Sequence, residues 1–151
     1  MVRRKFKLSI GQKTAESLKN KLAYMINGPR QEQNVFGIHT LSGLPKSDLI
    51  PSLAVSVAII DTIDYIVENI KSMYNRIPPQ LMKDITREGI YLTGGVSMIQ
   101  NLPEYIRKEI GIPLHHIQDP KNSTIRGLVE IMNNKDLRGL TYSLNDLASM
   151  R

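Results

Sequence analysis

Cysteine is absent from the 151-residue chain, and histidine occurs only three times. Without cysteine the chain has neither disulfides nor thiolate ligands for a metal, and this composition favours a cytoplasmic location. Two of the histidines are adjacent, at His115 and His116, within a segment that we expect to be a strand. Because neighbouring side chains of a strand point to opposite faces, this pair does not form a joint metal site.

Long apolar runs are missing as well. The most hydrophobic segment, residues 53–70, is interrupted by Asp61, Asp64 and Glu68, so we expect no transmembrane helix. The first seven residues, MVRRKFK, carry charge where a signal peptide has its apolar region. The sequence therefore predicts neither a membrane span nor a secretion signal.

The charge balance is basic, with 20 Lys and Arg against 14 Asp and Glu and a formal net charge of +6. Apart from the cluster at residues 3–7 the basic residues are scattered, and aromatic residues make up only 5% of the chain. Nucleic-acid-binding domains gather cations on one face or interleave them with aromatic side chains. We therefore expect a solvated surface and no nucleic-acid partner.

A hydrophobic content of 41% predicts one globular domain or a piece of a larger one.

The first half of the chain predicts a helix, a hairpin and a longer helix. Ser9 and Gln12 have capping-box spacing, and Asn27-Gly28-Pro29 is a strong stop, so the first helix is expected over residues 10–27. The next two expected elements are a hairpin over residues 34–51 with its turn at 42–45, and a helix over residues 52–76. Apolar residues at three- and four-residue steps indicate that this second helix is buried along most of its length.

The second half alternates helices and strands. We expect a short helix that Pro78-Pro79 starts and Gly89 ends, followed by a strand over 89–93. A helix over 101–110 follows, with a capping box at Asn101 and Glu104, and then a strand over 112–117. The last expected element is a helix after Asp119-Pro120, with Ile125, Leu128, Val129 and Met132 on one face. The first strand is apolar throughout, which is typical of burial on both faces of a parallel sheet. The order predicts an α/β layer.

Gly94 and Gly95 follow the first of these strands, at the carboxyl edge where open α/β sheets bind ligands. A residue without a Cβ suits a tight turn, and it equally suits the close approach of a ligand. Backbone N–H groups at the start of the next helix are able to face an anion or the edge of a base. From this pattern alone, a plain turn and a ligand-binding loop both stay open.

Six short motifs extend the interpretation. They are IGQKTAESLK at residues 10–19, SGLPK at 42–46, PPQL at 78–81, LTGGVSMIQNL at 92–102, GIP at 111–113, and DP followed by RG within 119–127. In this order they resemble the MreB-type bacterial actins, the rod-shape-determining filament proteins of the actin-like ATPase superfamily. The resemblance covers about residues 3–132. It implies the C-terminal part of an actin-like, ribonuclease H-like α/β fold.

The resemblance and the element order together predict three parts. They are a small adenosine-clasping subdomain at residues 1–77, containing helix, hairpin and long helix, a partial α/β sheet subdomain with the Gly-Gly nucleotide loop at 78–135, and a C-terminal tail at 136–151. Without further strands, the second part exposes a sheet edge and should self-associate.

The resemblance assigns nucleotide contacts to six residues. They are Glu16, Lys19, Gly94, Gly95, Val96 and Ser97. Glu16 and Lys19 share a helix face and would reach the ribose and the base, whereas the loop would contact adenine or the α-phosphate. Spacing alone favours an exposed surface pair for Glu16 and Lys19, and for Ser97 it favours a helix cap over a hydrogen bond to a ligand.

The sequence departs from the family pattern in two places. Val96 stands where the family usually has a third glycine, and its Cβ narrows the approach of a ligand. Leu128 and Val129 stand where the family keeps small residues. Neither departure is expected to abolish the fold, but both put nucleotide affinity in question.

The phosphate-binding half of the family's site has no counterpart in these residues. No Gly-rich loop with a neighbouring Asp occurs, and in the family both phosphate loops and the water-positioning carboxylate would precede residue 1. Phosphoryl transfer depends on those groups. We therefore expect a fragment that does not hydrolyse ATP alone, with ATP and Mg as cofactors of the full-length parent and none bound to this chain by itself.

The expected function is part of an ATP-binding filament protein for cell-shape control. This chain would contribute the adenosine half of the site and part of the assembly surface. The resemblance implies self-association into filaments, partners among other cell-shape and membrane-associated proteins, and a cytoplasmic location at the inner face of the membrane in the parent. The alternative is a non-catalytic actin-fold interaction module that does not bind nucleotide.

Overall fold

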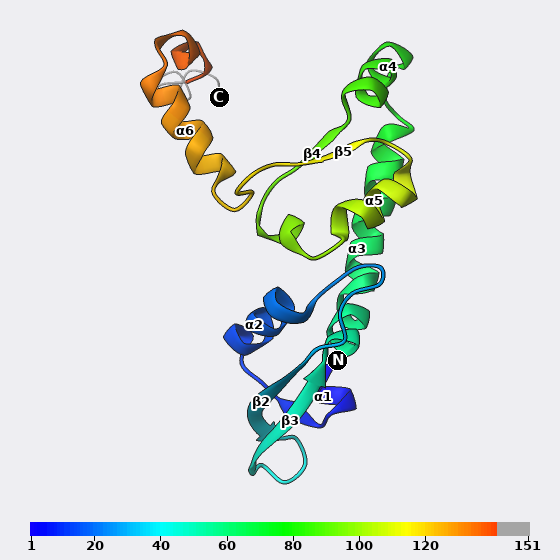
Figure 1. Cartoon of the computed structure of the whole chain (residues 1–151), viewed down its shortest axis with the longest axis vertical. Helices are drawn as coiled ribbons and strands as arrows, with labels where there is room; N and C mark the ends of the chain where they lie inside the picture. Colours follow the sequence, from blue (N-terminus) through cyan, green and yellow to red (C-terminus); the bar gives the residue numbers. More distant parts are fainter. Residues whose placement is uncertain (142–151) are drawn as a thin grey trace, which may run out of the picture.

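The long helix α3 (Ser52–Tyr74) is the axis of the molecule (Figure 1). Helix α2 (Gln12–Leu22) packs beside its N-terminal half, and helix α5 (Leu102–Ile110) packs beside its C-terminal half. This computed structural model describes residues 1–141. The long helix was predicted over residues 52–76, and the structure confirms it to within two residues because its apolar period is unbroken.

An antiparallel sheet lies at one end of α3. Its strands, in spatial order, are β1 (Leu8–Ser9), β2 (Glu32–His39) and β3 (Pro45–Pro51), and the short helix α1 (Val2–Lys5) precedes β1. In the β2–β3 pair, Phe36 lies opposite Ser47. The turn between these strands contains Gly43 at φ +69°, a conformation that favours glycine. The predicted hairpin is therefore confirmed.

The remaining elements follow α3 towards the other end of the molecule (Figure 1). In chain order they are α4 (Pro79–Glu88), β4 (Ile90–Leu92), the 3-10 helix η1 (Gly95–Met98), α5, β5 (Leu114–His116), α6 (Ser123–Asn133) and the 3-10 helix η2 (Lys135–Leu140). Strands β4 and β5 pair in parallel, with Ile90 opposite Leu114. This order matches the predicted alternation, and of the predicted tail, residues 142–151 lie outside the described residues.

One continuous hydrophobic core joins the two ends. It contains Leu18 and Leu22 of α2, Ile63 and Val67 of α3, Ile99, and Leu102 and Ile106 of α5. The core thus crosses the predicted boundary at residue 77. The division into a subdomain at 1–77, a subdomain at 78–135 and a tail stays a prediction.

Helix α2 ends earlier than predicted, at Leu22 instead of Asn27. Ala23 is already extended, with φ −70° and ψ 135°, and Tyr24 forms a parallel bridge with Gln100. The N–H of Met25 donates to the carbonyl of Gln100 at 2.8 Å. A pairing partner so far along the chain overrides the local helical pattern.

Both expected capping boxes were wrong. Gly11 caps α2 without a side-chain hydrogen bond, so the Ser9–Gln12 pair does not form the cap. Asn101 caps α5 in the left-handed conformation, at φ +61°, and its side-chain amide donates to the carbonyl of Ile26 at 2.9 Å. The amide of Asn101 therefore connects two chain segments instead of capping the helix.

The expected burial was also partly wrong. On α3 only one face is buried, and Leu53, Val57 and Met73 are exposed. On β4, Tyr91 is 62% exposed and stacks on His115 with ring centroids 4.8 Å apart. Within residues 1–141, α5 packs against β5 and no helix packs extensively on β4, so the side chain of Tyr91 stays uncovered.

Helix α6 carries its predicted apolar face, but that face is exposed. Its members are Ile125, Leu128, Val129 and Met132. In Figure 1 this helix stands away from the α3 axis, and its main packing partner is η2. None of the helices formed by residues 1–141 has both the length and the apolar composition that crossing a membrane requires.

Candidate functional site

Glu16 and Lys19 lie one turn apart on α2, as their spacing predicts. Both line a cavity of about 750 Å³ that α1, β1, α2 and α3 surround. Glu16 is exposed and Lys19 is half-buried. Ala15 and Leu18 of α2 and Ile59 of α3 are among the other lining residues. The cavity therefore combines an apolar floor with the carboxylate of Glu16 and the cationic side chains of Lys19 and Arg3.

The glycine loop follows β4 directly. Gly94 has φ +83°, a conformation that side-chain-bearing residues rarely adopt, so this position needs glycine for the turn itself. Its N–H donates to the carbonyl of Pro120 at 2.7 Å. Gly94 thus anchors the loop to the segment before α6, and its N–H is occupied by that contact.

Residues Gly95–Met98 form the 3-10 helix η1. Ser97 is only 5% exposed, and its Oγ donates to the carbonyl of Gly94 at 2.7 Å. The hydroxyl of Ser97 therefore closes the turn and does not point to solvent. Val96 is 47% exposed, and helix geometry gives the N–H groups of Gly95 and Val96 no acceptor within η1.

The two groups of predicted site residues lie at different cavities. Residues 94–97 are not among those that line the cavity beside Glu16 and Lys19. Ser97 lines a separate cavity of about 460 Å³ together with Glu104 and His116. What joins the two groups is the backbone bridge at Gln100, which ties the segment after α2 to the segment after η1.

A second set of contacts holds this arrangement in place. The hydroxyl of Tyr105 on α5 donates to Asp64 on α3, and Lys71 on α3 contacts Glu109 on α5 at 3.3 Å. The hydrogen bond to Asp64, together with partial burial, raises the pKa of Tyr105 to about 12. These polar contacts flank the apolar packing that fixes α5, and with it the end of the glycine loop, on α3.

Sequence reasoning missed Lys121 and the second role of Asn101. The side chain of Lys121 lies across Gly95: its Cγ and Cε are 3.8 and 3.9 Å from the point where a Cβ on Gly95 would sit. The Asp119-Pro120 pair predicts a turn at this point of the chain. It does not indicate that the chain after the turn lies against the glycine loop. Among the residues that the structure describes, no three His, Asp or Glu side chains gather as metal ligands.

Comparison with known proteins places this geometry in a family. The family model described as MreB/Mbl protein matches residues 1–139. The chain is 30% identical over 136 residues to the cell shape-determining protein Mbl of Bacillus subtilis strain 168, with 89% of this chain and 41% of Mbl covered. It is 30% identical over 139 residues to the cell shape-determining protein MreB of Escherichia coli K12, with 91% and 40% covered.

A solved structure agrees in fold. MreB5 of Spiroplasma citri, in a crystal structure bound to ADP, superposes with a TM-score of 0.83 at 27% sequence identity, covering 87% of this chain and 40% of that one. The chain thus spans about two fifths of the length of the relatives that it matches. Its architecture is a partial actin-like α/β fold, and the chain belongs to the MreB/Mbl family of cell-shape proteins.

Proposed function

We propose that this chain supplies the adenosine half of an ATP site in a cell-shape-determining filament protein. The observation that carries the proposal is the bridge between Tyr24 and Gln100. It ties the end of α2, with Glu16 and Lys19, to the end of η1, which begins at the glycine pair. The ADP-bound state of the structurally similar MreB5 supports the same assignment.

Each proposed contact has a chemical role. The exposed carboxylate of Glu16 accepts hydrogen bonds from ribose hydroxyls, and Lys19 donates to the base. The N–H groups of Gly95 and Val96 face the α-phosphate or the edge of adenine. Gly94 and Ser97 act differently, because their donors are already used within the loop. They shape the loop instead of donating to the ligand.

The residues fit adenosine and not the metal. Magnesium needs carboxylates and phosphate oxygens around one point, and residues 1–141 contain no such group of acidic side chains. In the proposed parent protein, the metal and the terminal phosphates are held by residues other than those at positions 1–141 of this chain. Phosphate cleavage therefore requires the rest of the protein.

The binding test uses two substitutions and one control. Glu16→Ala removes the ribose contact, and Gly95→Val places a side chain where the ligand approaches. Gly95 is suitable because its φ is not left-handed and a Cβ there meets only the flexible Lys121 stem. Glu130→Ala on the exposed surface of α6 is the control. Calorimetric titration with ATP measures the affinity of all four chains.

The wild-type chain should bind ATP in roughly the millimolar range, because half a site must offset the full cost of association. Glu16→Ala and Gly95→Val should each weaken binding, while Glu130→Ala should match the wild type. Unchanged affinity in both site variants would remove the assignment. Micromolar affinity in the wild type would show that the phosphate half is not needed.

Val96 is the observation that favours the alternative, a non-catalytic interaction module without nucleotide. Its exposed side chain lies at the loop surface where a ligand would approach. ATP binding by a Val96→Gly variant distinguishes a nucleotide-binding loop from an interaction module without nucleotide. If the loop binds nucleotide, this variant should bind as tightly as the wild type or tighter. If ATP produces no heat with the wild type and none with the glycine variant, the interaction module is the better account.

The proposed assembly surface is the outer face of the hairpin, formed by Phe36, Ile38, Leu41, Leu44 and Leu49. All five side chains are exposed. Phe36, Ile38 and Leu49 alternate with inward-facing residues, so they share one face of the sheet. A group of exposed large apolar side chains is typical of a protein interface.

Sedimentation tests this surface. The chain should form oligomers whose size rises with concentration, and the double variant Phe36→Asp with Ile38→Asp should stay monomeric. Val57→Asp, an exposed position on α3 outside the hairpin, is the control and should behave as the wild type. Equal association of the double variant and the wild type would place the contact elsewhere, for example at the β4–β5 edge.

A further inference from the structure

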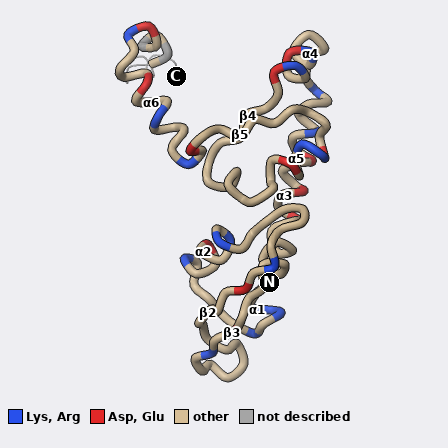
Figure 2. The backbone as a smooth tube through the Cα atoms, in the orientation of Figure 1, with Lys and Arg blue, Asp and Glu red and all other residues tan. Residues whose placement is uncertain are grey.

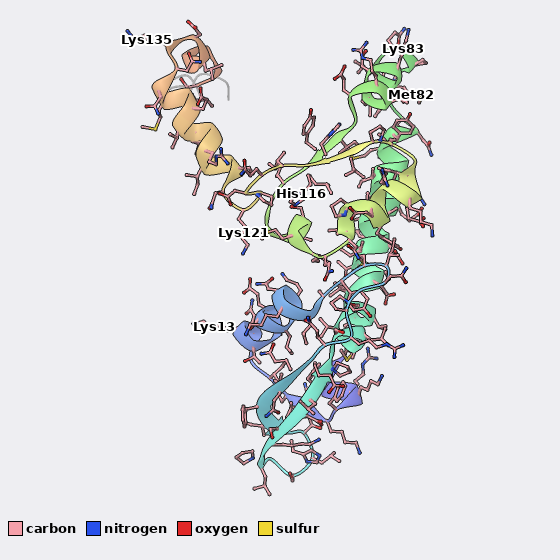
Figure 3. The ribbon with its side chains drawn as sticks, in the orientation of Figure 1. Lys13, Met82, Lys83, His116, Lys121 and Lys135 are labelled. Carbon is pink, nitrogen blue, oxygen red and sulfur yellow. The ribbon has the colours of Figure 1, made fainter. Side chains whose placement is uncertain are left out.

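Lys121 lies where the loop before α6 meets the glycine loop. Its aliphatic stem runs across the face of Gly95, in ordinary van der Waals contact with the position that a Cβ would take. The residue is exposed, and none of the salt bridges within residues 1–141 includes it. In the view of Figure 3, the side chain extends from this loop on the side where α2 lies.

The backbone that carries Lys121 is fixed from several directions. The carbonyl of Pro120 accepts the N–H of Gly94 at 2.7 Å and the Oγ of Ser123 at 3.0 Å. The carboxylate of Asp119 accepts from the side-chain amide of Asn122 at 3.0 and 3.1 Å. Asp119, the acidic residue nearest to Lys121 in the sequence, is thus engaged by Asn122.

We propose that Lys121 is a further nucleotide-binding residue, whose ammonium group pairs with the α-phosphate of a nucleotide held at the Gly94–Ser97 loop. This inference rests on the proposed function. The ammonium group then adds a charged donor to a loop in which the N–H groups of Gly95 and Val96 have no acceptor within η1. The stem lies on Gly95 already, so less side-chain freedom is lost when the ligand binds.

Charge selects the phosphate over the base. A hydrogen bond between an ammonium group and an anionic oxygen is about twice as strong as one between neutral groups. Cations are otherwise spread over the molecule with acidic residues among them, as Figure 2 shows, so attraction to the molecule as a whole does not explain a phosphate preference at this loop. The stem of Lys121, by contrast, lies beside the position that a Cβ on Gly95 would take.

The test compares AMP with adenosine, two probes that differ only in the α-phosphate. Lys121→Met keeps the stem on Gly95 and removes the charge, and Lys121→Arg restores the charge. Lys83→Met, an exposed position on α4, is the control for net charge. Amide chemical shifts of residues 94–97, followed during titration of each chain, give the affinity and show that each variant is folded.

Lys121→Met should weaken AMP binding about tenfold and leave adenosine binding within about twofold. Lys121→Arg should recover most of the loss, and Lys83→Met should match the wild type for both probes. Equal AMP affinity in Lys121→Met and the wild type would overturn the inference, as would equal weakening for AMP and adenosine. Absence of any shift in the wild-type chain with either probe would instead overturn the proposed function.

Discussion

Ile106 is the side chain through which α5, and with it the end of the glycine loop, is packed into the common core. It is 3% exposed and belongs to the same cluster as Ile63 and Val67 of α3. Ile106→Ala removes buried carbons and leaves a cavity that the rigid helices cannot fill. The free energy of unfolding should fall by about 3 kcal/mol, within the usual range of about 2–5 kcal/mol for such a change.

For a chain of this size, a loss of about 3 kcal/mol lowers the midpoint of thermal unfolding by roughly 6–12 °C. Circular dichroism during thermal and urea unfolding measures the loss. Ile125→Ala on α6 is the control: this side chain is 62% exposed, so its removal should change stability by less than about 0.5 kcal/mol.

Hydrogen exchange adds a second readout. Because the core is continuous, Ile106→Ala should lower amide protection in both α5 and the hairpin strand β2. A loss below about 1 kcal/mol, or a loss of protection confined to α5, would refute the reasoning that α5 and the hairpin end form one cooperative unit.

Three further outcomes are expected. Gly37→Ala should destabilise the chain by about 1–3 kcal/mol in urea unfolding, because its Cβ would lie 2.3 Å from the backbone carbonyl oxygen of Ser9. In the matched substitution Gly127→Ala, the new Cβ meets no atom within 4 Å, so this variant should instead raise the helix content. The free energy of unfolding should fall as pH rises from about 10 to about 12, because the folded pKa of Tyr105 lies above its ordinary value. Tyr105→Phe has no group that titrates at this position, so its urea midpoints should fall less over the same pH range than those of the wild type. A phosphate-release assay should find no ATP hydrolysis by the purified chain above the protein-free control.

The order of the elements could be predicted because their signals are local. The apolar period of α3 lies within that helix, and Pro78 and Pro79 stand at the cap and the first residue of α4. Gly111 ends α5 in the left-handed conformation, which glycine adopts readily. Such signals depend on neighbours a few residues away, and a single sequence contains them in full.

The errors concern contacts between distant residues. The bridge from Tyr24 to Gln100 ends α2 early, and no local sequence pattern predicts this bridge. Tyr91 was predicted to be buried in its strand but stacks on His115 with its ring exposed, because no described helix packs extensively over β4. Lys121 was not recognised for the same reason: its proximity to the glycine loop arises only when the chain returns after β5.

The most direct test of the central claim is an amide chemical-shift map of this chain titrated with ADP. The proposed adenosine half-site predicts that the shifts of Glu16 and Lys19 on α2 and those of Gly95 and Val96 on the loop change together, with one apparent affinity in roughly the millimolar range. Shifts confined to only one of these two segments, or none at saturating ADP, would contradict it.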